Sequence, residues 1–357
     1  MKKSPGHTAR VSAPAAEAID DDEIAAAGVA LVREESARRI LVPDMPAGRL
    51  DKVLSELLAT VSRSRVRQWI DAGAVEVNGL PSRARAPVMR GDVITLDPPP
   101  AAEDSAFVPE PMTLDIVYED AAILVLNKPA GLVVHPAAGH WSGTLLNGLL
   151  AHDPRLAALP RAGIVHRLDA DTSGLMVVAR SLQAHADLVR QLQARSVSRE
   201  YWAIVHGEAP LTGTIDTPIG RDPRNPLRFR ARGGQGAREA RTLFRRLAVA
   251  ETGTLRTSWL ACKLDTGRTH QIRVHLESIR HPLVGDPLYR LYRPTHLAGA
   301  VTGFNRQALH AARLAMVHPK TGRDVGWTSL PPADMRALMR QLGFSVPRRV
   351  VSAFDSP

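Results

Sequence analysis

The first half of the chain contains two stretches of helical hydrophobic spacing followed by two stretches in which apolar and polar residues alternate. The helices are expected to start at Leu50 and after Ser62 or Ser64, either of which can cap the second helix, and Gly73 is expected to end it. Asn78 and Gly79 are typical of a tight hairpin turn. The pattern predicts two helices and a small sheet, over residues 50–58, 62–73, 75–79 and 91–96.

Strand-like apolar runs dominate the second half. They occur at residues 114–118, 123–126, 175–179, 201–206 and 258–264, with helical spacing at 145–150 and 184–194. Strands and helices do not alternate regularly, so we expect an α+β catalytic domain with a mainly antiparallel mixed sheet, preceded by a small α/β domain.

Composition divides the chain further. Residues 1–45 are rich in Ala and acidic residues and poor in aromatics, which predicts a disordered tail. A run of prolines at residue 98 indicates a linker. The expected organisation is a tail at 1–45, a small domain at 46–97, a linker at 98–112, a catalytic domain at 113–345 and a C-terminal tail at 346–357.

The net charge of +10 is unevenly distributed. Residues 1–40 hold six Lys and Arg against seven Asp and Glu, and the rest holds 40 against 29. A basic folded region favours a polyanionic partner. The single cysteine, Cys262, is expected to fill a core position, and no signal peptide or membrane span is evident, so we expect a soluble cytoplasmic protein without a membrane partner.

The string from His166 to Met176 places Asp169 between Arg167 and a Thr-Ser-Gly turn. Strand segments are expected on both sides, over 163–165 and 175–179, with Arg167 and Asp169 on one extended strand and pointing the same way. The alternative is that Asp169 caps a turn, as we conclude for the Asp of Arg49-Leu-Asp, where no such turn follows. The longer string resembles the signature of the RluA-type pseudouridine synthases, and this implies that Asp169 is the catalytic carboxylate.

Three further strings resemble that family, in the expected order, and they span residues 127–136, 199–207 and 264–276. The first has no catalytic role assigned to it. In the second, the resemblance implies that Tyr201 stacks on the target base; the alternative is a core aromatic. Tyr201 shares one strand face with Ala203 and Val205. Arg199 stands where the family usually has lysine, and its role is left open.

The third of these strings implies that Arg273 pairs with the catalytic carboxylate, and an ion pair would favour the ionised form of Asp169. The alternative is a helix-surface pair between Arg273 and Glu277. A helix capped by Thr269 is expected here, with residues 272, 276 and 279 on its buried side.

Residues 49–97 resemble an S4 RNA-binding domain. Arg63 and Arg67 lie one turn apart at the start of a helix, where phosphate binding is favoured, and Arg85 could extend the same face, together with residues 83 and 90. The alternative is a solvated arginine face. Residues 221–246 hold nine arginines around a glycine-rich segment, and they indicate a loop or hairpin that clamps RNA, or else a disordered basic loop.

The resemblance implies an RNA pseudouridine synthase that acts without cofactor or metal, as a monomer, on 23S rRNA or the assembling large ribosomal subunit. The loop of helix 69 is the expected target, and other 23S sites are the alternative. Arg167 is expected to fill the space left by the flipped base. A non-catalytic RNA-binding assembly factor is the second class of function.

Three other chemistries fit less well. Asp265 begins the aspartic-protease tripeptide, but no second copy follows. Histidines 166, 270, 275 and 281 lack the spacing of a metal site and are expected to be structural or to contact RNA. A glycoside hydrolase needs a second positioned carboxylate, for which Asp171 is the nearby candidate.

Overall fold

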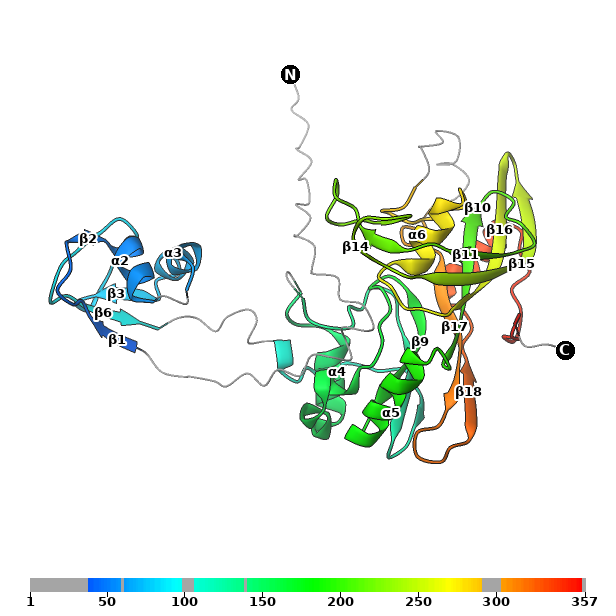
Figure 1. The fold of residues 1–357 in the computed structure, drawn as a ribbon, viewed down its shortest axis with the longest axis horizontal. Coiled ribbons are helices and arrows are strands. Elements are labelled where there is room, and N and C mark those ends of the chain that lie inside the picture. Colours follow the sequence, from blue (N-terminus) through cyan, green and yellow to red (C-terminus); the bar gives the residue numbers. More distant parts are fainter. Residues whose placement is uncertain (1–37, 59–60, 98–105, 138–139, 291–302, 355–357) are drawn as a thin grey trace, which may run out of the picture. The chain divides into compact units, whose positions relative to one another are not determined.

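The computed structural model describes residues 38–58, 61–97, 106–137, 140–290 and 303–354 (Figure 1). They form two compact units, divided between residues 105 and 106, each with its own hydrophobic core. Across these described ranges, no helix has both the length and the apolar character needed to cross a membrane.

The first unit combines two helices with a four-stranded sheet of order β1-β6-β3-β4 and a short β2–β5 pair. Ser62 caps α3 by accepting a hydrogen bond from the backbone N–H of Arg65, and Asn78 and Gly79 form the β3–β4 turn with positive φ. Both features confirm the sequence prediction. The elements are β1 (Arg38–Leu41), β2 (Gly48–Arg49), α2 (Leu50–Leu57), α3 (Arg63–Asp71), β3 (Val75–Val77), β4 (Leu80–Pro81), β5 (Pro87–Val88) and β6 (Val93–Leu96).

The prediction of a disordered tail reaching residue 45 is wrong for its last part. Residues 38–41 form β1, which pairs antiparallel with β6, and Val42 is buried in the core of this unit. The strand is short and begins with two arginines, so it carries little hydrophobic signal in the sequence. Residues 1–37 lie outside the described part of the chain.

The second unit is built on a nine-stranded sheet of order β11-β15-β16-β10-β17-β9-β8-β7, with β18 paired to β17. Every pairing is antiparallel except that between β9 and β17, which is parallel. The expected α+β class with a mainly antiparallel mixed sheet is confirmed. The strands of this sheet are β7 (Ile116–Glu119), β8 (Ile123–Lys128), β9 (Ser173–Ala179), β10 (Ser198–His206), β11 (Thr212–Asp216), β15 (Arg241–Thr252), β16 (Leu255–Leu264), β17 (Leu309–Val317) and β18 (Asp324–Thr328).

Helices pack on both faces of this sheet, because its central strands are apolar on both sides. On β10, Tyr201, Ala203 and Val205 join the core cluster that contains α4 and α6, whereas Trp202 and Ile204 join the cluster that contains α7. Helix α5 packs on a third cluster with β8 and β9. The helices are α4 (Leu145–His152), η2 (Pro154–Ala158), η3 (Pro160–Gly163), α5 (Leu182–Gln193), α6 (Gln271–Ser278) and α7 (Ala333–Gln341).

Two boundaries of this unit differ from the sequence prediction. Residues 106–112, expected to belong to the linker, pack on α4, where the side chain of Asn147 donates hydrogen bonds to the carbonyl oxygens of Ala106 and Val108. At the other end, the expected C-terminal tail packs against β10: Ser352 Oγ and the N–H of Ala353 both donate to the carboxylate of Glu200. Side-chain contacts with distant residues fix both segments, and local composition does not reveal them.

Candidate active site

Asp169 lies in an irregular segment just before β9. The N–H of Thr172 donates to the carbonyl oxygen of Asp169 at 3.0 Å and closes a turn. Gly174 follows with φ of 119°, where a Cβ atom would lie 2.3 Å from the carbonyl oxygen of Ala311 on β17. Only glycine fits this close approach of two strands, so the Thr-Ser-Gly sequence lets the segment that carries Asp169 reach the centre of the sheet.

The strand predicted over 163–165 is wrong: its only pairing is a single bridge between Ile164 and Val178. Gly163 instead ends η3 with φ of 81°, outside the extended conformation of a strand. Arg167 and Asp169 therefore do not lie on a common strand. Both side chains nevertheless line the same pocket.

Lys128, at the end of β8, holds the turn beside Asp169. Its Nζ atom is fully buried and donates to the carbonyl oxygens of Ala170 (2.7 Å), Pro129 (2.8 Å) and Leu132 (2.8 Å). Burial lowers the pKa of Lys128 to about 7, while the charge of Asp169 acts in the opposite direction. Three acceptors favour the ammonium form, which has three N–H donors. Sequence reasoning assigned no role to this string and missed the lysine, although a lysine among apolar residues at a strand end was a signal.

Arg273, from α6, connects two carboxylates. Its Nη1 atom donates to Oδ2 of Asp169 at 3.0 Å, and its Nε and Nη2 atoms donate to Asp286 at 2.7 and 2.9 Å. Asp286 is buried and also accepts from the backbone N–H groups of Leu288 and Tyr289. The carboxylate of Asp286 thus orients the guanidinium that binds Asp169. Asp286 lies ten residues after the string at 264–276, and the sequence alone did not assign it a role.

The electrostatic environment keeps Asp169 ionised. Burial opposes ionisation, but the guanidinium charges of Arg273 and Arg167, together with His270 in the acid range where its ring is protonated, outweigh it and hold the pKa of Asp169 below its usual value of 3.8. The alternative surface pair between Arg273 and Glu277 is not formed, because Glu277 binds Arg228 at 2.6 Å instead.

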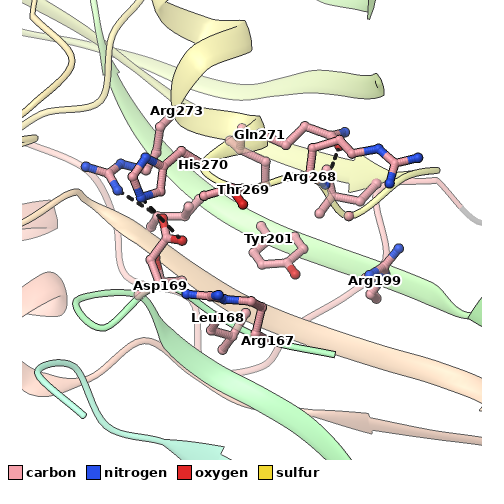
Figure 2. Close-up of a pocket in the computed structure, with 15 residues that line it drawn as sticks. Arg167, Leu168, Asp169, Arg199, Tyr201, Arg268, Thr269, His270, Gln271 and Arg273 are labelled. Atoms are coloured by element: carbon pink, nitrogen blue, oxygen red, sulfur yellow. Dashed lines mark hydrogen bonds and ion pairs between the residues drawn. The ribbon is translucent and has the colours of Figure 1, made fainter. Parts of the chain in front are cut away.

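Tyr201 stands beside this carboxylate on β10. Figure 2 shows Asp169, His270 and Arg273 grouped on one side of the Tyr201 ring, with Arg199 and Arg268 on the other. The ring belongs to the core cluster formed with α6, so one side rests on apolar residues while part of it lines the pocket. Tyr201 is therefore both a core aromatic and a pocket residue.

The start of α6 differs from the prediction that Thr269 caps it. His270 is the N-cap residue, in a left-handed conformation with φ of 56°, and it makes no capping hydrogen bond. Gln271 instead holds the turn that precedes the helix, since its Oε1 atom accepts from the backbone N–H of Arg268 at 3.0 Å and from Oγ1 of Thr266 at 2.7 Å. This arrangement turns the ring of His270 toward Asp169, with Nε2 lying 3.9 Å from Oδ1.

A narrow pocket of about 50 Å³ and a neighbouring cavity of about 370 Å³ share five polar residues: Arg167, Asp169, Thr269, His270 and Arg273. The narrow pocket is also lined by Tyr201. The larger cavity is also lined by Arg221 and Phe229, which belong to the arginine-rich residues 221–246, called here the basic segment. The carboxylate therefore lies where the two spaces meet.

The basic segment forms a three-stranded sheet, of order β13-β12-β14, rather than an irregular loop. Arg228, just before β13, stacks on the ring of Tyr289, with its Cζ atom 5.2 Å from the ring centroid. Arg228 is thus anchored beside Tyr289, whose hydroxyl contacts His270 in the active site. The strands are β12 (Ile219–Arg221), β13 (Phe229–Ala231) and β14 (Gln235–Arg238). Of the nine arginines, three lie on these strands, three lie between them and three lie on β15.

The rival chemistries find little support in this geometry. His166 is buried and accepts a hydrogen bond from the N–H of Val177, while burial lowers its pKa to about 3, so it is structural. Asp171 lines the larger cavity but not the pocket of Asp169 and Tyr201. Within the described residues, no group of three His, Cys, Asp or Glu side chains could hold a metal ion. Cys262 is buried in the core, as expected.

Two of the arginines predicted to bind RNA in the first unit have a structural role. Arg63 and Arg49 bind the buried carboxylate of Asp51 at 3.0 and 2.9 Å, and Arg67 approaches it at 3.9 Å. The structural interpretation of Arg49-Leu-Asp is therefore confirmed. The side chains of Arg63 and Arg67 remain half exposed, and Arg85 is exposed.

Comparisons with known proteins agree with this geometry. Residues 122–278 match the family model described as RNA pseudouridylate synthase, and residues 48–94 match the S4 domain. A protein named ribosomal large subunit pseudouridine synthase D from Neisseria meningitidis (serogroup A) is 48% identical, over 90% of this chain and 85% of the relative. Proteins of the same name from Nitrosomonas europaea and Pseudomonas aeruginosa are 46% and 48% identical, over 86% and 82% of this chain and 88% and 92% of theirs.

Among solved structures, human RNA Pseudouridylate Synthase Domain Containing 4 matches with a TM-score of 0.50 and 24% identity, covering 65% of this chain and 94% of that chain. This likeness concerns the fold alone.

Proposed function

The chain belongs to the RNA pseudouridylate synthase family, and from this premise we propose that it isomerises uridine to pseudouridine in 23S rRNA, with Asp169 as the catalytic carboxylate. The observation that carries the proposal is the ion pair of Asp169 with Arg273 beside Tyr201, at the junction of a narrow pocket with a cavity that the basic sheet lines. The relatives named for the large ribosomal subunit support rRNA as the substrate, and the S4 domain supports RNA binding. The loop of helix 69 is the proposed target.

The reaction breaks the C1′–N1 bond of the uridine, turns the uracil within the pocket and forms a C1′–C5 bond. The C5 proton is lost, N1 gains a proton, and no atom is gained or lost overall. An ionised Asp169 can either attack the sugar or remove its C2′ proton, and both routes require the carboxylate form that Arg273 favours. Tyr201 provides a surface against which the detached uracil stacks while it turns.

A uridine within folded RNA must leave its stack to reach Asp169, at a cost of a few kcal/mol. Arg167 lines both the narrow pocket and the larger cavity, so it stands beside either space through which a flipped base could reach Asp169. We propose that Arg167 fills the space that the flipped base leaves in the RNA stack, since a planar guanidinium can both stack and donate hydrogen bonds. The basic sheet and the S4 domain would bind the RNA backbone on either side of the target uridine. The proposed place of action is the cytoplasm, on rRNA.

The test is pseudouridine mapping by carbodiimide-dependent reverse-transcription stops, on ribosomal RNA from cells that lack this gene. The cells are complemented with the wild-type chain or with Asp169→Asn. A stop in helix 69 that is lost in the deletion and restored by wild type alone would support both the activity and the target. Stops restored elsewhere in 23S rRNA would support the alternative of other sites. An unchanged pattern would contradict the proposal and favour the non-catalytic assembly factor.

A further inference from the structure

His270 belongs to a chain of hydrogen bonds that starts in the basic sheet and ends at Asp169. The backbone N–H of Phe229, on β13, donates to the hydroxyl of Tyr289 at 3.0 Å. That hydroxyl lies 2.8 Å from Nδ1 of His270, and Nε2 on the other side of the imidazole lies 3.9 Å from Oδ1 of Asp169. The Phe229 and Tyr289 rings also pack edge-on against the imidazole. The proposed mechanism assigns no role to His270 or Tyr289.

The position of the hydrogens in this chain follows from counting donors and acceptors. Tyr289 is fully buried, and its hydroxyl oxygen already accepts from Phe229. Among the described residues, its own hydrogen has only Nδ1 of His270 as an acceptor. A buried hydroxyl hydrogen without an acceptor costs about 1–3 kcal/mol. The hydroxyl therefore donates to Nδ1, and the proton of a neutral imidazole lies on Nε2, the nitrogen that faces Asp169.

The protonation states agree with this assignment. Burial lowers the pKa of His270 to about 4, with the nearby Arg273 and Arg167 acting in the same direction, so the ring is neutral at pH 7. Burial raises the pKa of Tyr289, which keeps its hydroxyl protonated. Oδ2 of Asp169 already accepts from Arg273, whereas Oδ1 faces Nε2.

We propose that His270 is a positioning residue: Tyr289 locks it as the Nε2–H tautomer, so that it presents a second hydrogen-bond donor to Asp169. The inference rests on the proposed function, and it assigns Oδ1 as the oxygen that faces the uridine. Arg273 fixes one carboxylate oxygen and His270 limits the rotation of the other. The present separation of 3.9 Å closes to a hydrogen bond with a movement of about 1 Å, as is usual when a substrate fills a site.

Two amide substitutions separate this role from simple packing. In His270→Gln the amide nitrogen takes the place of Nε2, and in His270→Asn it takes the place of Nδ1, so only glutamine retains the donor toward Asp169. With uridine-containing RNA, we expect kcat to fall less than about tenfold in His270→Gln and about a hundredfold in His270→Asn, with KM little changed in both. The acid limb of kcat should move to higher pH in His270→Asn alone, because Asp169 loses a donor that favours its ionised form.

The tautomer is measured directly by two-bond ¹H–¹⁵N correlation spectra of histidine-labelled protein, with His270→Gln used to assign the signal. We expect the Nε2–H form in wild type and its partial loss in Tyr289→Phe. An Nδ1–H tautomer in wild type would overturn the proposal, as would equal kcat values and unmoved pH profiles in the two amide variants. Circular dichroism of each variant confirms folding. The spectra do not depend on turnover, so a failure of the proposed function and a failure of this inference give different results.

Discussion

Arg273 donates from Nη1 to Oδ2 of Asp169 at 3.0 Å, while the rest of its guanidinium is bound by Asp286. The arginine is thus shared between a carboxylate that faces the pocket and a buried one that holds it in place. Because Asp286 fixes the guanidinium plane, the orientation of Asp169 depends on a residue that lines neither the narrow pocket nor the larger cavity.

Asp286→Asn should therefore impair both activity and stability. Removing one carboxylate of this buried network leaves Arg273 with Asp169 as its one remaining charged partner among the described residues, and we expect the free energy of unfolding to fall by about 3 kcal/mol. We expect kcat to fall at least about tenfold, because the guanidinium no longer has a fixed direction. Urea unfolding and single-turnover kinetics measure the two effects. Glu251→Gln, at the exposed pair with Arg256, is the matched control and should change neither.

Asp169→Asn should abolish turnover and retain RNA affinity. The amide has the shape of the carboxylate but can neither attack the sugar nor remove its proton, so we expect kcat to fall by more than about a thousandfold. Filter binding should give a dissociation constant within about threefold of wild type. Asp171→Asn, two residues away, should keep its turnover. A comparable loss in both variants would instead favour two catalytic carboxylates.

The pH dependence of kcat should show no acid limb from Asp169 above pH 3.8, because its folded-state pKa lies below this usual value. The same shift means that the ionised group stabilises the fold above the unfolded-state pKa, and this contribution is lost as the pH falls through the folded-state pKa. In Arg273→Gln the acid limb should move to higher pH, because the substitution removes a positive charge that lowers the pKa of Asp169. A limb at the same pH in both proteins would contradict this assignment of the pKa to Asp169.

Lys128→Met should destabilise the catalytic unit. The substitution leaves three carbonyl oxygens around the buried Nζ position without their donor, and we expect the free energy of unfolding to fall by about 3 kcal/mol. Because Ala170 is one of the three, kcat should also fall. Thermal unfolding and turnover are the measurements. Lys320→Met, at an exposed lysine of the same unit, should change stability by less than about 0.5 kcal/mol.

Substitutions in the S4 domain should distinguish RNA contact from structure. Arg85→Gln should weaken RNA binding and reduce the slope of log K against log salt by about one, without affecting stability. Arg63→Gln should have the same effect on the slope, but it should also lower the stability of this unit, because Arg63 helps to neutralise the buried Asp51. An unchanged slope in both variants would place the RNA contact elsewhere.

The sequence predicted those parts of the fold and site that depend on local pattern. Strand alternation placed Tyr201 on the correct face of β10, and the Ser62 cap and the Asn78 turn follow from neighbouring residues. The contacts of Lys128 with Ala170, and of Tyr289 with Phe229, join residues 42 and 60 positions apart and leave no periodic signal. The left-handed conformation of His270, with φ of 56°, is likewise not marked by any local pattern of apolar and polar residues.

The parallel pairing of β9 with β17 also determines when the chain can become an enzyme. The strand that follows Asp169 is held by contacts of Ser173 and Gly174 with His310 and Ala311, which lie 137 positions later. During synthesis the S4 domain emerges early and all its strand pairings lie within residues 38–96, so it can fold first. The catalytic segment must wait until residue 311 has been made, and closing so long a loop is slow. A nascent chain would thus acquire a folded RNA-binding module well before it acquires catalysis.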